Sequence, residues 1–78
     1  MKFYIPTIEE TTLGNKMYEV FIENVEESDM DRIWQNVEGN GISVDCYEDN
    51  ELVVSIAKED WGFTKAEFIK EVKRLAKK

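Results

Sequence analysis

The spacing of apolar residues changes twice along the chain from alternate positions to helical positions, and this order restricts the fold more than any other feature. Residues 17–23 alternate in the way that a strand requires, and residues 42–47 and 51–57 each place their more apolar side chains on one face. A period of two is typical of strands, whereas spacings of three and four are typical of amphipathic helices. With residues 2–5 as a weaker strand that ends at Pro6, the order is β-β-α-β-β-α.

The clearest helical signal lies near the C-terminus. Thr64 and Glu67 form a T-x-x-E capping box, and Phe63 and Phe68 have the spacing of a hydrophobic staple. The apolar residues that follow fall on one helical stripe, which consists of Phe68, Ile69, Val72, Leu75 and Ala76. We expect a helix at about 65–77.

A second helix is expected at about 29–38. Ser28 and Asp31 have the spacing of a helix start, and the glycines of Gly39-Asn40-Gly41 can end the helix in a left-handed conformation. The apolar stripe of this helix consists of Met30, Ile33, Trp34 and Val37. The helix is short, so packing rather than intrinsic propensity must stabilise it.

Turn residues connect the strands into hairpins. Glu48-Asp49-Asn50 separates the third strand from the fourth, and Gly14-Asn15 is the expected turn within the connection 6–16. The economical fold is α+β, with a four-stranded, mainly antiparallel sheet and both helices packed on one face. Its core includes Trp34, Phe63 and Phe68. A chain of 78 residues is expected to form one domain, 1–78, built from two β-β-α halves at about 1–38 and 41–78.

The residue types argue against an enzyme. The chain has no histidine, the usual general base near neutral pH, and its single cysteine excludes an internal disulfide. Cys46 falls on the core face of its strand, which indicates a small buried side chain rather than a nucleophile. No phosphate-binding loop or EF-hand pattern is present. We therefore expect no catalytic residues, no cofactor and no metal.

The distribution of charge is more informative. Ten basic and seventeen acidic residues give a net charge of −7, but residues 64–78 alone carry +4 and residues 1–63 carry −11. The first acidic group consists of Glu23, Glu26, Glu27, Asp29 and Asp31, and the second acidic group consists of Asp45, Glu48, Asp49 and Glu51. Acids at a helix start and bases at a helix end explain part of this pattern. The rest is either charge for solubility or a recognition surface.

The sheet face opposite the helices offers a second candidate site. Its expected side chains are Tyr4, Met17, Phe21, Tyr47 and Val53, a set more aromatic than a solvated face requires. Exposed apolar patches often mark partner sites, so Tyr4, Phe21 and Tyr47 are candidate contacts. The alternative is that the connection 6–16 folds across this face. The acids interleaved with these rings would repel phosphate, which argues against nucleic acid as the ligand of this face.

These features favour a non-enzymatic protein-binding module, expected in the cytoplasm, that inhibits a nucleic-acid-handling protein by docking acids on its basic site. In size and acidity the chain resembles small viral anti-restriction and anti-CRISPR proteins that act as DNA mimics, and no motif is shared with them. Two alternatives stay open. One is an adaptor or homodimer that associates through the aromatic face. The other is a nucleic-acid binder that uses the lysines of the last helix, Lys65, Lys70, Lys73, Lys77 and Lys78. No membrane segment is expected.

Overall fold

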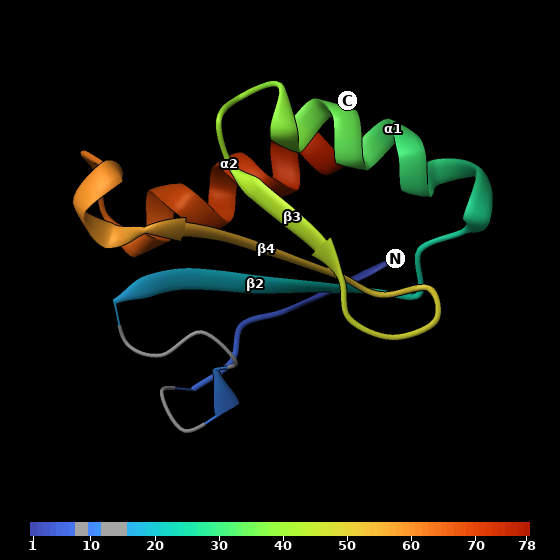
Figure 1. Ribbon diagram of the computed structural model, residues 1–78, viewed down its shortest axis with the longest axis horizontal. Helices are drawn as coiled ribbons and strands as arrows, with labels where there is room; N and C mark the ends of the chain where they lie inside the picture. The colour runs from blue at the N-terminus through green and yellow to red at the C-terminus, as the bar shows by residue number, and fades with distance from the viewer. Residues whose placement is uncertain (8–9, 12–15) are drawn as a thin grey trace.

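The computed structural model describes residues 1–7, 10–11 and 16–78, and within them the predicted order of elements is confirmed (Figure 1). The elements are β1 (Lys2–Tyr4), β2 (Met17–Glu23), α1 (Glu27–Glu38), β3 (Ser43–Cys46), β4 (Leu52–Ala57), a short 3-10 helix η2 (Lys58–Asp60) and α2 (Lys65–Lys77). The predicted Gly14-Asn15 turn lies outside the described residues.

The four strands form one antiparallel sheet in the order β1-β2-β4-β3, and both helices cover the same face, as expected (Figure 1). The long strands β2 and β4 pair at the centre, while β1 and β3 form the edges. Each helix also contacts a strand of the other β-β-α half, because α1 packs on β3 and α2 packs on β2. The core therefore lies between the sheet and the helix layer, and the opposite sheet face points away from both α1 and α2.

Side chains from both layers fill this core. The members that are fully buried and largest are Phe68, Ile22, Ile33, Leu52, Leu75, Val20, Val25, Val37, Val54 and Val72. Two core predictions need correction. Trp34 is only half-buried, and its indole N–H donates to Glu38 at 3.1 Å. Phe63 is 70% exposed, because Trp61 packs edge-on against Phe68 at 5.5 Å and occupies the place that the staple assigned to Phe63.

The prediction that Cys46 is buried is also wrong. Its thiol is exposed. The alternation along β3 is as expected, since Val44 belongs to the core. Cys46, however, is the last residue of an edge strand, with Leu52 of β4 as its cross-strand partner. A residue at the corner of a sheet has few neighbours to cover it, and the strand period alone does not reveal this.

The two helices begin differently. The side chain of Thr64 accepts a hydrogen bond from the backbone N–H of Glu67 at 3.2 Å, which confirms the predicted cap of α2. The cap predicted at Ser28 is wrong, because α1 begins earlier. Glu26 is its N-cap residue, without a side-chain cap bond, and Ser28 lies inside the first turn.

Gly41 ends α1 in the way that its sequence indicates. Its φ is +77°, and its N–H donates to the carbonyl of Glu38 at 3.0 Å. The N–H of Ile42 then donates to the carbonyl of Val37 at 3.3 Å, so the two bonds form a Schellman motif. Ile42 and Val37 are both buried, which supplies the apolar contact that accompanies this motif.

Side chains of α1 donate hydrogen bonds to backbone carbonyls at the C-terminal end of α2. The guanidinium of Arg32 donates to the carbonyl of Ala76 at 3.0 Å, and the amide of Asn36 donates to the carbonyl of Leu75 at 3.2 Å. The last four carbonyls of a helix have no partner within it, so these bonds fasten the C-terminal turn of α2 to α1.

The phenylalanines at 63 and 68 provide a matched test of this core. We expect Phe68→Ala to lower the free energy of unfolding by about 3–5 kcal/mol, because it empties a fully buried position. Phe63→Ala is expected to change it by no more than about 0.5 kcal/mol, since that ring lies mostly in solvent. Urea denaturation of the two variants checks both values. Equal losses would contradict the exposure of Phe63.

The cap of α2 provides a second test. Thr64→Ala is expected to cost about 1 kcal/mol, because the backbone N–H of Glu67 loses its acceptor. Ser28→Ala is the control, since Ser28 lies within α1 and caps nothing; alanine there leaves the denaturation midpoint unchanged or raises it. A loss at Ser28 that matched the loss at Thr64 would show that the helix starts are wrongly assigned.

Candidate functional site

The two acidic groups meet at one end of the sheet. The register pairs Ile22 of β2 with Leu52 of β4. Glu23 and Glu51 are the next residues outward on the two strands, so the last acid of β2 lies beside the acid that precedes β4. Each of them lines the same hollow on the sheet face opposite α1 and α2. The sheet thus joins acids that are 28 positions apart in the sequence.

The connection between β2 and α1 reinforces this arrangement. The N–H of Val25 donates to the carbonyl of Asn50 at 3.0 Å, which holds the segment after β2 against the β3–β4 turn. Figure 1 shows the start of α1 and the β3–β4 hairpin at the same end of the molecule, on the right. The first residues of α1 and the hairpin turn therefore present their acids from neighbouring positions.

Three aromatic rings lie next to these acids on the open sheet face. Phe21 is the cross-strand partner of Tyr4, with ring centroids 6.2 Å apart, and it lies 5.0 Å from the ring of Tyr47. Phe21 is only 7% exposed, whereas Tyr4 is 37% and Tyr47 50% exposed. Of the three predicted aromatic contacts, the tyrosines are accessible and Phe21 forms the floor between them.

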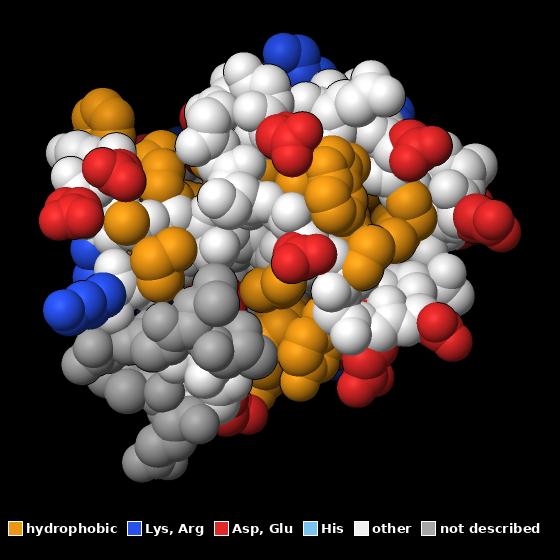
Figure 2. Space-filling model, viewed as in Figure 1, with side chains coloured by type: hydrophobic (Ala, Val, Ile, Leu, Met, Phe, Trp, Pro, Cys, Tyr) orange, Lys and Arg blue, Asp and Glu red, His pale blue; other side chains and the backbone are white. Residues whose placement is uncertain are grey.

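The rings and the acids line one hollow of about 190 Å³. We call it the acid-rimmed patch, and its residues are Tyr4, Glu10, Phe21, Glu23, Tyr47 and Glu51. In Figure 2, hydrophobic side chains are exposed at the lower centre of the molecule and acidic side chains lie around them. The acidic surface and the aromatic face, which the sequence presents as alternative sites, therefore meet in a single surface.

Glu10 belongs to this surface although sequence reasoning did not select it. The hydroxyl of Tyr4 donates to its carboxylate, and the N–H of Thr7 donates to Glu10 Oε1 at 3.0 Å. The hydrogen bond to Glu10 raises the pKa of Tyr4, and the bonds from Tyr4 and Thr7 lower the pKa of Glu10. Glu10 lies in the connection between β1 and β2, where no periodic pattern assigns a residue to a face.

Neighbouring acids act on the carboxyl of Glu51. Its partial burial and the nearby charges of Glu48 and Glu23 raise the pKa of the Glu51 carboxyl above the ordinary 4.5. A nearby negative charge disfavours the ionised form of a carboxyl. Lys2 is the cross-strand neighbour of Glu23 and supplies one positive charge nearby. Burial and neighbouring negative charges nevertheless disfavour the ionised form of Glu51. A further positive charge at this end of the sheet would therefore be favourable.

The other predicted acids contribute unequally. Glu26, Glu27 and Asp31 are exposed around the first turns of α1. Asp29 is half-buried and forms an ion pair with Arg32 at 3.3 Å, so its charge is already matched. This pairing offsets part of the charge that Asp29 offers to a partner.

The second acidic group lies mainly in the hairpin. Asp45 is exposed on β3, where its carboxylate accepts a hydrogen bond from the N–H of Cys46 at 2.9 Å. Glu48 and Asp49 are exposed in the turn. In the described residues these side chains take part in no ion pair with lysine or arginine, and they extend the negative surface beyond Glu51.

The cations of α2 are partly engaged within the molecule. Arg74 pairs with Glu71, and the ammonium of Lys73 lies 5.8 Å above the ring of Phe3. Lys65, Lys70, Lys77 and Lys78 are exposed. The candidate nucleic-acid surface therefore consists of separate exposed lysines, in a chain whose net charge of −7 opposes phosphate.

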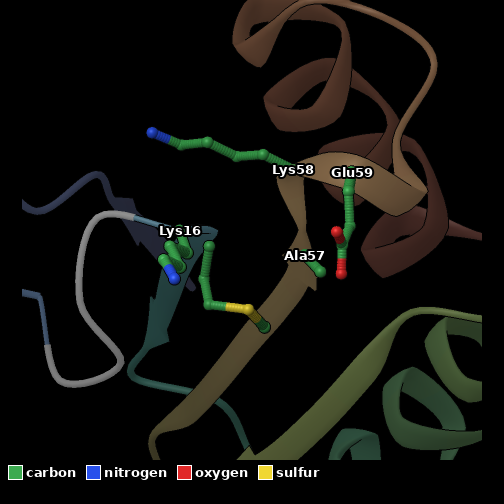
Figure 3. A pocket seen from close by; sticks show the side chains of 5 residues that line it. Lys16, Ala57, Lys58 and Glu59 are labelled. Carbon is green, nitrogen blue, oxygen red and sulfur yellow. The ribbon is translucent and has the colours of Figure 1, made fainter.

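A larger hollow of about 540 Å³ lies at the opposite end of the central strands (Figure 3). Lys16, Met17, Ala57, Lys58 and Glu59 line it, and the side chain of Lys58 extends away from Ala57 and Glu59. Its charges are mixed and do not converge on one point. The residues that line this hollow therefore indicate the chemistry of a ligand less clearly than those of the acid-rimmed patch.

Comparison with known proteins gives no further guide: no family model, no curated protein and no solved structure matches this chain. Among residues 1–7, 10–11 and 16–78, no helix has both the length and the apolar character needed to cross a membrane. The same residues contain no group of three or more cysteine and acidic side chains that could hold a metal ion.

The crowding at Glu51 predicts a pH-dependent stability. A carboxyl whose folded pKa is raised loses folding stability as the pH rises from its ordinary pKa through the raised one. We therefore expect Glu51→Gln to raise the thermal midpoint at about pH 7, and the gain to vanish below about pH 3.5, where Glu51 is protonated in both states. Scanning calorimetry at both pH values measures this.

Glu27→Gln is the control for this prediction. It removes the same charge from the exposed start of α1, where an acid favours the helix dipole, so we expect no gain in stability. A gain at Glu27 as large as the gain at Glu51 would mean that the net charge, and not the crowding at the patch, determines the effect.

Proposed function

We propose that this protein is a non-enzymatic binding module that docks its acid-rimmed patch onto a basic site of a nucleic-acid-handling protein and thereby inhibits it. The observation that carries the proposal is the junction of the two acidic groups with exposed aromatic rings on the sheet face opposite α1 and α2. An interface of this kind has an apolar centre, with tyrosine enriched, and a charged rim.

The chemistry of the rim indicates the charge of the partner. Glu23 and Glu48 lie close enough to Glu51 to contribute to the raised pKa of its carboxyl. A cationic surface would relieve their mutual repulsion, whereas an anionic one would increase it. Long-range attraction would also accelerate the encounter of the two proteins, because complementary potentials guide diffusing molecules.

A nucleic-acid-binding groove is the cationic surface that fits best. Such grooves place lysine and arginine side chains to meet phosphates, and carboxylates spread along one end of a small protein can meet the same side chains. Glu26, Glu27, Glu48 and Asp49 continue the negative surface beyond the patch. A protein bound in the groove would exclude nucleic acid by occupying its site.

The same rim opposes self-association through this face. Two copies packed patch to patch would bring Glu23 and Glu51 of each copy against those of the other, and like charges across an interface are costly. The aromatic rings alone favour such packing, but the acids around them do not. We therefore place a different, basic protein on this surface.

The proposal predicts displacement of nucleic acid. Labelled DNA or RNA bound to a panel of purified nucleic-acid-handling proteins with basic grooves is titrated with this protein, and fluorescence anisotropy reports release. We expect at least one member to release its nucleic acid. The double variant Glu23→Lys with Glu51→Lys should be weaker by at least about tenfold, because it reverses the rim.

The matched control is Glu59→Lys with Asp60→Lys, which reverses two charges in η2, where neither residue lines the patch. It has the same net charge as the patch variant and should retain at least most of the displacement. Equal losses in the two variants would mean that net charge alone drives binding. A lack of displacement by the unaltered protein across the panel would contradict the proposed function.

A further inference from the structure

We propose that the acid-rimmed patch seats one arginine side chain of its partner and prefers arginine to lysine. This inference rests on the proposed function, in which the patch meets a cationic protein, and it names the group that enters the hollow. It follows from the size of the hollow, from the arrangement of its rings and from the position of its carboxylates.

The size of the hollow favours a single side chain. Sites for small molecules usually measure about 300–1,000 Å³. The patch offers about 190 Å³ and opens onto the sheet face. A hollow of this size suits one anchoring side chain, of the kind that contributes most of the affinity in many protein interfaces.

The rings provide surfaces for a flat cation. Relative to Phe21, the ring of Tyr4 is tilted by 36° and the ring of Tyr47 by 55°. The three rings therefore line a hollow instead of forming one plane. The hydrogen bond from Tyr4 to Glu10 restrains the Tyr4 ring, and the packing against Phe21 supports Tyr47. Aromatic faces attract cations, and arginine most often occupies such sites.

The carboxylates favour a ligand group that has several hydrogen-bond donors. Glu23 and Glu51 are half-buried and line the hollow beside the rings, while Glu10 lines it from the segment after β1. A guanidinium can donate to a carboxylate with two parallel N–H groups and keep further donors for another acceptor. A lysine ammonium is more strongly hydrated and does not stack, so it gains less from this combination.

Three short peptides test the preference: acetylated and amidated Gly-X-Gly in which X is arginine, lysine or citrulline. Citrulline keeps the shape of arginine but carries no charge. Each peptide is titrated at constant ionic strength into isotope-labelled protein, and two-dimensional NMR follows the backbone and tyrosine ring signals. We expect the arginine peptide to shift signals at the patch and to bind about three- to fivefold tighter than the lysine peptide. The citrulline peptide should not bind measurably.

Two variants separate the contribution of the ring from that of the charge. Tyr47→Leu keeps an apolar side chain at a half-exposed position and should reduce the arginine preference to about unity. Phe63→Leu is its control, because it alters an exposed ring that does not line the patch. Glu23→Gln with Glu51→Gln should weaken the arginine and lysine peptides alike, while the spectra report whether the fold is retained.

Equal affinity of the arginine and lysine peptides, shifts centred away from the patch, or unchanged arginine preference in Tyr47→Leu would each overturn the inference. The proposed function can stand in those cases, because displacement of nucleic acid requires only that the rim meet cations. Conversely, arginine binding at the patch without displacement from any groove would keep the inference and reject the nucleic-acid-handling partner.

Discussion

The antiparallel pairing of β2 with β4 is the constraint on which the rest of the structure depends. Six consecutive residue pairs, from Met17 with Ala57 to Ile22 with Leu52, determine which side chains face the helices and which face the other side. A shift of one residue would exchange the two faces. The same pairing places the end of β2 beside the start of β4, so the register that builds the core also brings Glu23 to Glu51. Fold and candidate site therefore share one determinant.

Most of the fold could be predicted from the sequence because its signals are local. The period of β2, the cap at Thr64 and the glycine at position 41 each act within a few residues. The errors arise where distant groups compete. Phe63 has the spacing of a staple, but the ring that packs against Phe68 in this way is that of Trp61. The bonds from α1 to the last carbonyls of α2 are invisible in the sequence, since they join residues about forty positions apart.

The candidate site could be predicted in its parts but not in its assembly. Composition identified the acids, and strand alternation identified Tyr4, Phe21 and Tyr47. Their meeting depends on strand order, because the sequence does not show that β2 lies between β1 and β4. Glu10 was not predicted for a related reason, since the hydrogen bond from Tyr4 is what indicates that it lies on this face. The two candidate surfaces therefore adjoin in one patch, and the proposed function uses charge and aromatic contact together.

The distribution of charge shows how such a site can persist in a small protein. In the helix layer, Arg32 of α1 donates to the last turn of α2, Arg74 pairs with Glu71 and Lys73 lies above the ring of Phe3, whereas at the patch Glu23 and Glu48 act on the carboxyl of Glu51. This separation leaves repulsion at one end of the sheet, which lowers the stability of the free protein. A bound cation beside Glu51 would offset the repulsion from Glu48 and Glu23 and would favour the ionised form of its carboxyl. Charges arranged only for solubility would be expected to spread apart, and their concentration around three rings supports the proposal that this surface binds a partner.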